Sequence, residues 1–100
     1  MRYELTDEQK AVCEKAVQRF GRRSQLRKVA EELYELALEC DKAADGRGDA
    51  GALALERADV AVVLHQFDEL LLPSLRKAVP AKIASQIERL ERRIADEQSA

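Results

Sequence analysis

The sequence predicts an all-α protein of four helices in a bundle-like arrangement. Glycine and proline fall in clusters, and the segments between them repeat apolar residues with a helical period. Alternating β-branched and aromatic residues, which would indicate strands, are sparse. A chain of 100 residues is expected to form one domain, spanning 1–100, with a modest core. Association into an oligomer would bury more apolar surface than such a core does.

The first helix is expected between Thr6 and Gly21. Thr6 is a preferred N-cap, and Gln9 stands at the capping-box position three residues later. Gly21 is typical of the residue that ends a helix. Its buried side is expected to carry Val12 or Cys13, together with Ala16, Val17 and Phe20.

The second helix is expected to begin after Ser24 and to end at the glycine-rich stretch Asp45–Gly51. That stretch is too polar to pack and is predicted to be a mobile loop. One face of the helix is apolar and carries Leu26, Val29, Leu33, Leu36 or Ala37, and Cys40.

A third helix is predicted from about Ala52 to Leu72, because Pro73 is expected to end it. Its buried side would carry Leu53, Val60, Leu64, Phe67 and Leu71. The last helix is predicted to begin at Pro80, since proline suits the first turn of a helix. Its apolar side would carry Ile83, Ile87, Leu90 and Ile94.

Charge and composition exclude several classes of function. Charged residues make up 36% of the chain, but 19 acidic against 17 basic residues leave a net charge of −2. This balance argues against binding of nucleic acid or of an anionic membrane. No apolar run approaches the length of a membrane span, and the polar start lacks a signal-peptide core, so a cytoplasmic protein is expected. Cys13 and Cys40 are interpreted as reduced core residues.

Two pairs of acidic residues border the predicted apolar faces. Glu32 and Glu35 on the second helix are three residues apart, as are Glu56 and Asp59 on the third, so each pair shares a face. A short connection favours antiparallel packing of the two helices, which would bring the pairs together. Four carboxylates in a partly dry site repel one another unless a cation is bound.

The ligand type favours a hard metal ion. Carboxylate oxygens without histidine or cysteine suit Mg²⁺ or Mn²⁺, and Mg²⁺ often shares its coordination with substrate phosphates. Lys28, one turn before Glu32, could reach a phosphate or neutralise one of the glutamates. These residues indicate a metal-dependent enzyme acting on a phosphorylated small molecule. The competing interpretation is a solvated helix face on which Arg27, Lys28 and Arg57 pair with the acids.

The segments "KVAEELYELA" and "ERADVAVVL" resemble the MazG-like nucleotide pyrophosphohydrolases, a branch of the all-α nucleoside triphosphate pyrophosphatases. The signature of that family is EExxE, a spacer and ExxD. It is matched here by Glu31-Glu32-x-x-Glu35 and Glu56-x-x-Asp59. The resemblance covers Gln25–Gln66 well and the remainder in helical outline, although "KIASQIERLERRI" loosely resembles the closing helix of phage-type relatives.

The resemblance implies a MazG-type fold and a reaction. A nucleoside triphosphate would be hydrolysed between its α and β phosphates to a monophosphate and pyrophosphate. It also implies that Mg²⁺ is held by four acids, namely Glu32, Glu35, Glu56 and Asp59. Glu31 would lie behind them or act as an alternative ligand, and Glu32 or Glu35 would activate the attacking water. The family works as dimers or tetramers, so a homodimer or homotetramer is expected.

Other residues have two interpretations each. The candidates for substrate contact are Lys28, Gln25, Gln66, Lys82 and Arg89. Gln66 could bind a base or sugar, or form a polar interface contact. Lys82, Arg89 and Arg93 could meet a triphosphate, or keep the last helix soluble. The aromatic residues expected in the core rather than as stacking platforms are Phe20, Tyr34 and Phe67.

Two alternative functions are kept. One is a phosphoribosyl-ATP pyrophosphohydrolase, which has a similar carboxylate layout, although His65 stands six residues after Asp59 and does not reproduce the arrangement expected there. His65 is interpreted instead as a surface or interface residue. The other alternative is a non-catalytic helical oligomerisation module whose acids are solvated charges.

Overall fold

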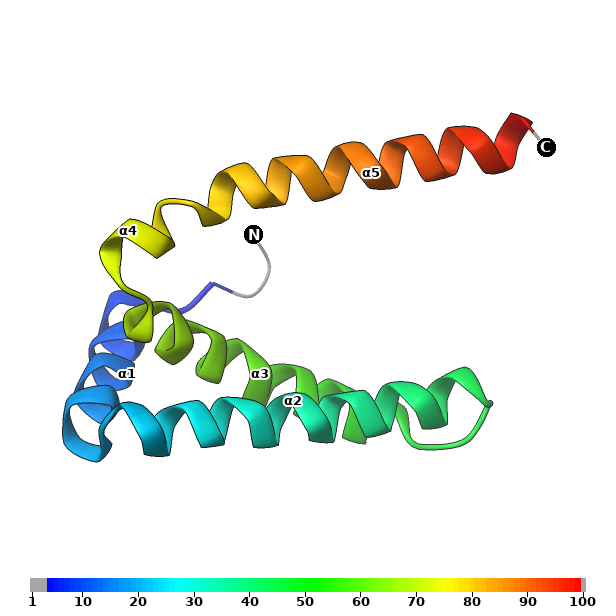
Figure 1. Ribbon diagram of the computed structural model, residues 1–100. Helices are drawn as coiled ribbons and strands as arrows, with labels where there is room; N and C mark the ends of the chain where they lie inside the picture. The colour runs from blue at the N-terminus through cyan, green and yellow to red at the C-terminus, as the bar shows by residue number, and fades with distance from the viewer. Residues whose placement is uncertain (1–3, 100) are drawn as a thin grey trace. The chain divides into compact units, whose positions relative to one another are not determined.

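The computed structural model describes residues 4–99, and every regular element within them is a helix (Figure 1). The elements are α1 (Asp7–Phe20), α2 (Arg22–Ala44), α3 (Ala50–Leu70), the single-turn α4 (Pro73–Arg76) and α5 (Val79–Ser99). The predicted all-α class is confirmed. Of the described residues, those up to Leu70 form one compact unit, and those from Leu71 on form a second.

The start of α1 is set by the predicted capping box. The backbone N–H of Gln9 donates to Thr6 Oγ1 at 3.1 Å, and the backbone N–H of Thr6 donates to Gln9 Oε1 at 2.8 Å. Two N–H groups that the helix itself leaves unpaired are thereby satisfied. Asp7 and Glu8 in the first turn add negative charge where the helix dipole favours it.

A single glycine joins α1 to α2. Gly21 has a φ of 85°, and its N–H donates to the Val17 carbonyl at 3.0 Å, while its own carbonyl accepts from the Gln25 N–H at 3.1 Å. It therefore closes one helix and opens the next. The predicted start after Ser24 was wrong by three residues, because no side-chain cap is needed when a glycine in this conformation makes the turn.

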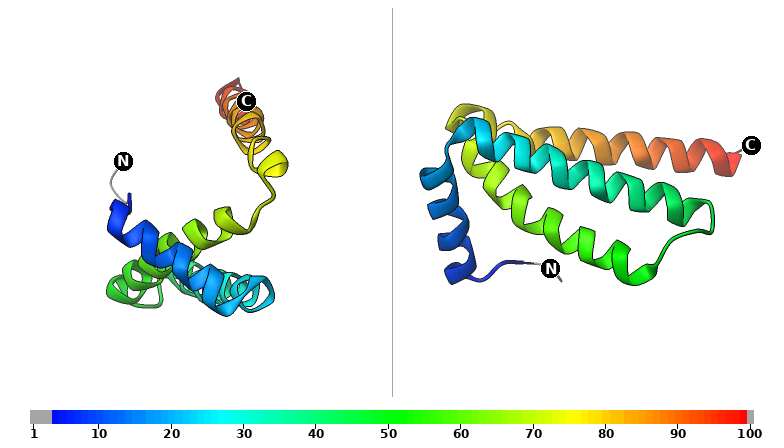
Figure 2. Two further views of the ribbon diagram at one scale, coloured as in Figure 1. Left: turned by 90° about the vertical axis from the view of Figure 1, so that its left-hand side faces the viewer. Right: turned by 90° about the horizontal axis from the view of Figure 1, so that it is seen from below.

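The first unit is built on an antiparallel pair of long helices. Figures 1 and 2 show α2 and α3 lying side by side, with α1 crossing near the start of α2. The loop between α2 and α3 is shorter than predicted, because Ala50 and Gly51 belong to α3. Asp49 Oδ1 accepts the Gly51 N–H at 2.9 Å, which supplies the start of that helix. At the other end, the Arg22 guanidinium donates to the Leu70 carbonyl.

Proline placement differs from the prediction in the second unit. α3 ends at Leu70, before the predicted Leu72, and Pro73 opens the extra turn α4. α5 begins at Val79, which places Pro80 within its first turn. The predicted apolar positions of α5 are about half exposed in this unit: Ile83, Ile87, Leu90 and Ile94.

The buried apolar core is small and lies where α1, α2 and α3 meet. It consists of Cys13, Val29, Val60, Val63 and Leu70. Cys13, Val29 and Val60 were predicted.

Several other predicted core positions are wrong. Phe20 and Tyr34 are 61% and 73% exposed, and Leu33, Leu64 and Cys40 are exposed too. The reason is geometric, because each of the three helices is covered by the other two over only part of its surface. Among the described residues, no helix is both long and apolar enough to cross a membrane.

Candidate metal centre

Four carboxylates converge between the two long helices. Glu32 and Glu35 come from α2, and Glu56 and Asp59 come from α3. One oxygen from each residue lies within 4.8 Å of the oxygens of the other three. The i, i+3 spacing places each pair on one helix face, and the antiparallel packing of α2 and α3 brings the two faces together. The structure therefore assembles the group that the sequence predicted.

The group contains buried oxygens without partners. Glu32 is buried, and Glu35, Glu56 and Asp59 are half-buried. Within the described part of the chain, Glu32 Oε2 and Glu56 Oε2 accept no hydrogen bond. Buried polar atoms in proteins are nearly always paired, and a carboxylate can only accept. Oxygens bound to one Mg²⁺ at about 2.1 Å lie at most about 4.2 Å apart, so small side-chain rotations would bring all four within coordination distance of one ion and leave positions for water.

The electrostatics of the group are those of crowded like charges. The pKa of the Glu35 carboxyl is raised above its ordinary value, chiefly by the negative charge of Glu32, with desolvation and the charge of Glu56 adding to the shift. Lys28 Nζ lies 2.8 Å from Glu32 Oε1, and this hydrogen bond is the main reason that the pKa of Lys28 is raised. Lys28 thus offsets part of the negative charge, while its side chain stays half exposed.

A hollow of about 760 Å³ opens beside the carboxylates, between α1, α2 and α3. Glu32 and Asp59 reach it, and so does Lys28. Gln25 and Gln66 line it as well. Both are buried, and their Oε1 atoms accept no hydrogen bond from any described residue. Of the five predicted substrate-contact residues, three therefore border one space next to the acids.

The remaining predicted residues lie elsewhere. Glu31 is exposed, stands outside the carboxylate group and lies 3.9 Å from Lys28 Nζ, although it lines the rim of the hollow. Lys82 and Arg89 are exposed on α5 in the second unit, so their contact with phosphate stays a prediction. His65 is half-buried on α3 and belongs to a different group of side chains from the four acids.

Sequence reasoning missed part of the wall of the hollow. Phe20 was assigned to the core, but it lines the hollow from the end of α1, and Ser24 and Arg27 line it from α2. Arg27 directly precedes Lys28 in the sequence, and this adjacency could have indicated that a second basic side chain lines the hollow.

The arrangement has a definite chemical capacity. Four carboxylates can hold a hard divalent cation, one ammonium group and exposed Arg27 can attract phosphate, and two amides can recognise a polar group. Comparison of the chain with known protein families, with curated proteins and with solved structures found no match.

Proposed function

We propose that the protein is a MazG-like nucleotide pyrophosphohydrolase that converts a nucleoside triphosphate to a monophosphate and pyrophosphate with Mg²⁺. The observation that supports this most is the convergence of Glu32, Glu35, Glu56 and Asp59 beside a hollow lined by Lys28. A solvated acidic face would not bury carboxylate oxygens that lack a hydrogen-bond partner among residues 4–99.

In this proposal the four acids hold Mg²⁺, or Mn²⁺ in its place. The ion supplies positive charge to the phosphate oxygens. Glu32 or Glu35 accepts a proton from the water that attacks the α phosphorus, and the bond to the bridging oxygen of the β phosphate breaks. Lys28 pairs with a phosphate oxygen. Gln25 and Gln66 donate or accept hydrogen bonds to the base or sugar, since an amide can do both.

The proposal is tested by incubating the purified protein with ribo- and deoxynucleoside triphosphates, with and without Mg²⁺, and separating the products. Monophosphate and pyrophosphate that form only with metal are expected. Glu56→Gln and Asp59→Asn should abolish turnover and retain the helical circular dichroism spectrum. Asp68→Asn, an exposed position on α3, is the matched control and should keep full activity. Full activity in Glu56→Gln would refute the metal assignment.

A second candidate is a non-catalytic oligomerisation module. The half-exposed apolar row on α5 favours it, because such a row on a helix is typical of a surface that packs against another. Mg²⁺ separates the two, since a module without a metal site should show the same thermal stability with and without the ion. Phosphoribosyl-ATP belongs in the substrate panel as the nearest enzymatic alternative.

A further inference from the structure

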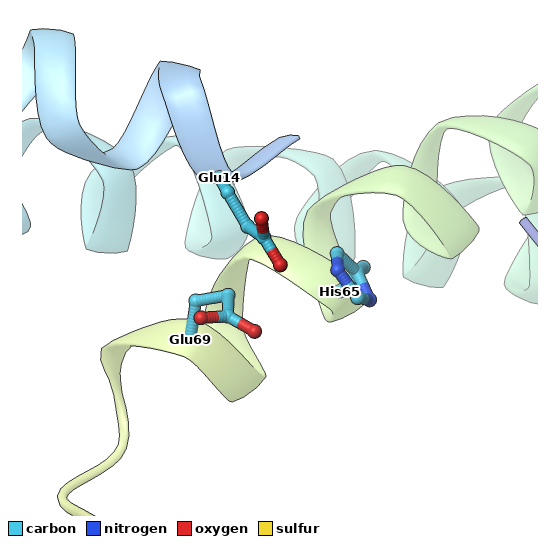
Figure 3. A group of neighbouring side chains, drawn as sticks. All are labelled: Glu14, His65 and Glu69. Atoms are coloured by element: carbon cyan, nitrogen blue, oxygen red, sulfur yellow. The ribbon is translucent and has the colours of Figure 1, made fainter. Parts of the chain in front are cut away.

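A second group of potential ligands lies where α1 crosses α3. Glu14 on α1 points toward His65 and Glu69, which stand on successive turns of α3 (Figure 3). One imidazole nitrogen and one oxygen of each carboxylate lie within 4.8 Å of one another. His65 is the only histidine in the chain. It stands six residues beyond Asp59, which is about 9 Å along the helix axis, so the two groups are separate.

One nitrogen of the His65 imidazole, Nε2, is buried without a hydrogen-bond partner among the described residues. His65 and Glu69 are both half-buried, and Glu14 is exposed to solvent. A neutral imidazole nitrogen that is withdrawn from water and left unpaired loses the hydrogen bond it would make in solvent. In the tautomer in which this nitrogen carries the lone pair, a ligand that accepts electrons from it would restore that interaction.

We propose that Glu14, His65 and Glu69 form a second cation site, selective for Zn²⁺ or a similar transition-metal ion. An imidazole nitrogen with two carboxylate oxygens is a donor set that suits Zn²⁺, with water in the fourth position, whereas the all-oxygen group suits Mg²⁺. The i, i+4 spacing of His65 and Glu69 places two ligands on one helix face. Ligand atoms at about 2.1 Å from one ion lie at most about 4.2 Å apart, so the closure required is small.

The consequence of binding would be structural. An ion at this site joins α1 to α3 through ligands from both helices. Ala16 and Phe20, on the same helix as Glu14, form the α1 wall of the hollow beside the four acids. Zn²⁺ would therefore hold that wall in place whether or not the hollow binds a nucleotide.

Because the histidine is unique, its ring signals in a nitrogen-15 NMR spectrum report on this site alone. Tag-free protein is titrated with Zn²⁺, in the absence of nucleotide. We expect one equivalent to shift the ring nitrogen resonances and to identify which nitrogen binds the ion. Mg²⁺ at the same concentration should leave them unchanged. If one equivalent of Zn²⁺ leaves the ring signals unmoved, the proposal is overturned.

The affinity is measured by calorimetry in a Cys40→Ser, Glu56→Gln background, which removes the exposed thiol and one acid of the first group. Glu14→Gln changes an exposed residue and keeps the size of its side chain. It should raise the dissociation constant for Zn²⁺ at least about tenfold. His65→Gln should do the same, and Asp68→Asn, next to Glu69 but outside the group, should leave it unchanged. Equal affinity in the background protein and in Glu14→Gln would refute the site.

Discussion

Replacing Glu56 by glutamine should change the stability of the protein in opposite directions with and without Mg²⁺. Glu56 lies within 4.8 Å of three other carboxylates, and its Oε2 atom is buried without a partner in the described residues. The substitution removes one negative charge and keeps the shape of the side chain. Metal-free protein should therefore gain stability, whereas the stabilisation by Mg²⁺ should be largely lost, because the ion loses an anionic ligand.

The size of the gain follows from Coulomb's law. Two negative charges 4.8 Å apart, as Glu56 and Asp59 are at most, repel by roughly 3 kcal/mol at an effective dielectric constant near 20. Salt and water screen part of this repulsion, so a gain of about 1–2 kcal/mol is expected. For a domain of this size, that raises Tm by roughly 5–10 °C. In the parent protein, Mg²⁺ at 100 times its Kd should add about 2.7 kcal/mol.

Thermal unfolding followed by circular dichroism, in EDTA and in a series of Mg²⁺ concentrations, measures both effects. Asp68→Asn is the control, because it removes one negative charge from the exposed side of α3. A metal-free Tm of Glu56→Gln at or below that of the parent, with an undiminished Mg²⁺ shift, would show that the four acids do not form a cation site.

Four further predictions concern single positions. Gly21→Ala should lower the free energy of unfolding by about 1–2 kcal/mol in urea titrations, because φ is 85° there; an unchanged midpoint would contradict the proposed turn. Thr6→Ala should cost about 1 kcal/mol in the same assay through loss of the cap, with Gln18→Ala, an exposed position on α1 away from the cap, for comparison. The pKa of Glu35 is raised in the folded protein, so the stability that Glu35 contributes to the metal-free protein is complete below its pKa in the unfolded state and is lost as pH rises through its pKa in the folded state. The Tm of the parent relative to that of Glu35→Gln should therefore fall from pH 4 to 7, and a rise would refute this. Lys28→Met should raise KM for the nucleotide several-fold in steady-state assays, provided that Lys28 meets a phosphate; an unchanged KM would assign it a purely structural ion pair.

Local features of the chain could be predicted from the sequence because they depend on neighbours a few residues apart. The capping box at Thr6, the stop at Gly21 and the pairing of acids at i, i+3 all follow from helix geometry. The convergence of the acidic pairs also followed, since a short connection between long helices leaves little choice but antiparallel packing. The family resemblance and the proposed chemistry rest on these same acids.

Only the tertiary structure decided which helix faces are covered. Phe20 and Cys40 occupy positions of the correct period, but they are exposed because no helix of the first unit packs over them. Glu14 lies near His65 only because α1 crosses α3, and the sequence between the two residues does not determine how the helices cross. A period of 3.6 residues determines which side chains share a face, whereas the partner of each face depends on contacts between residues far apart in the chain.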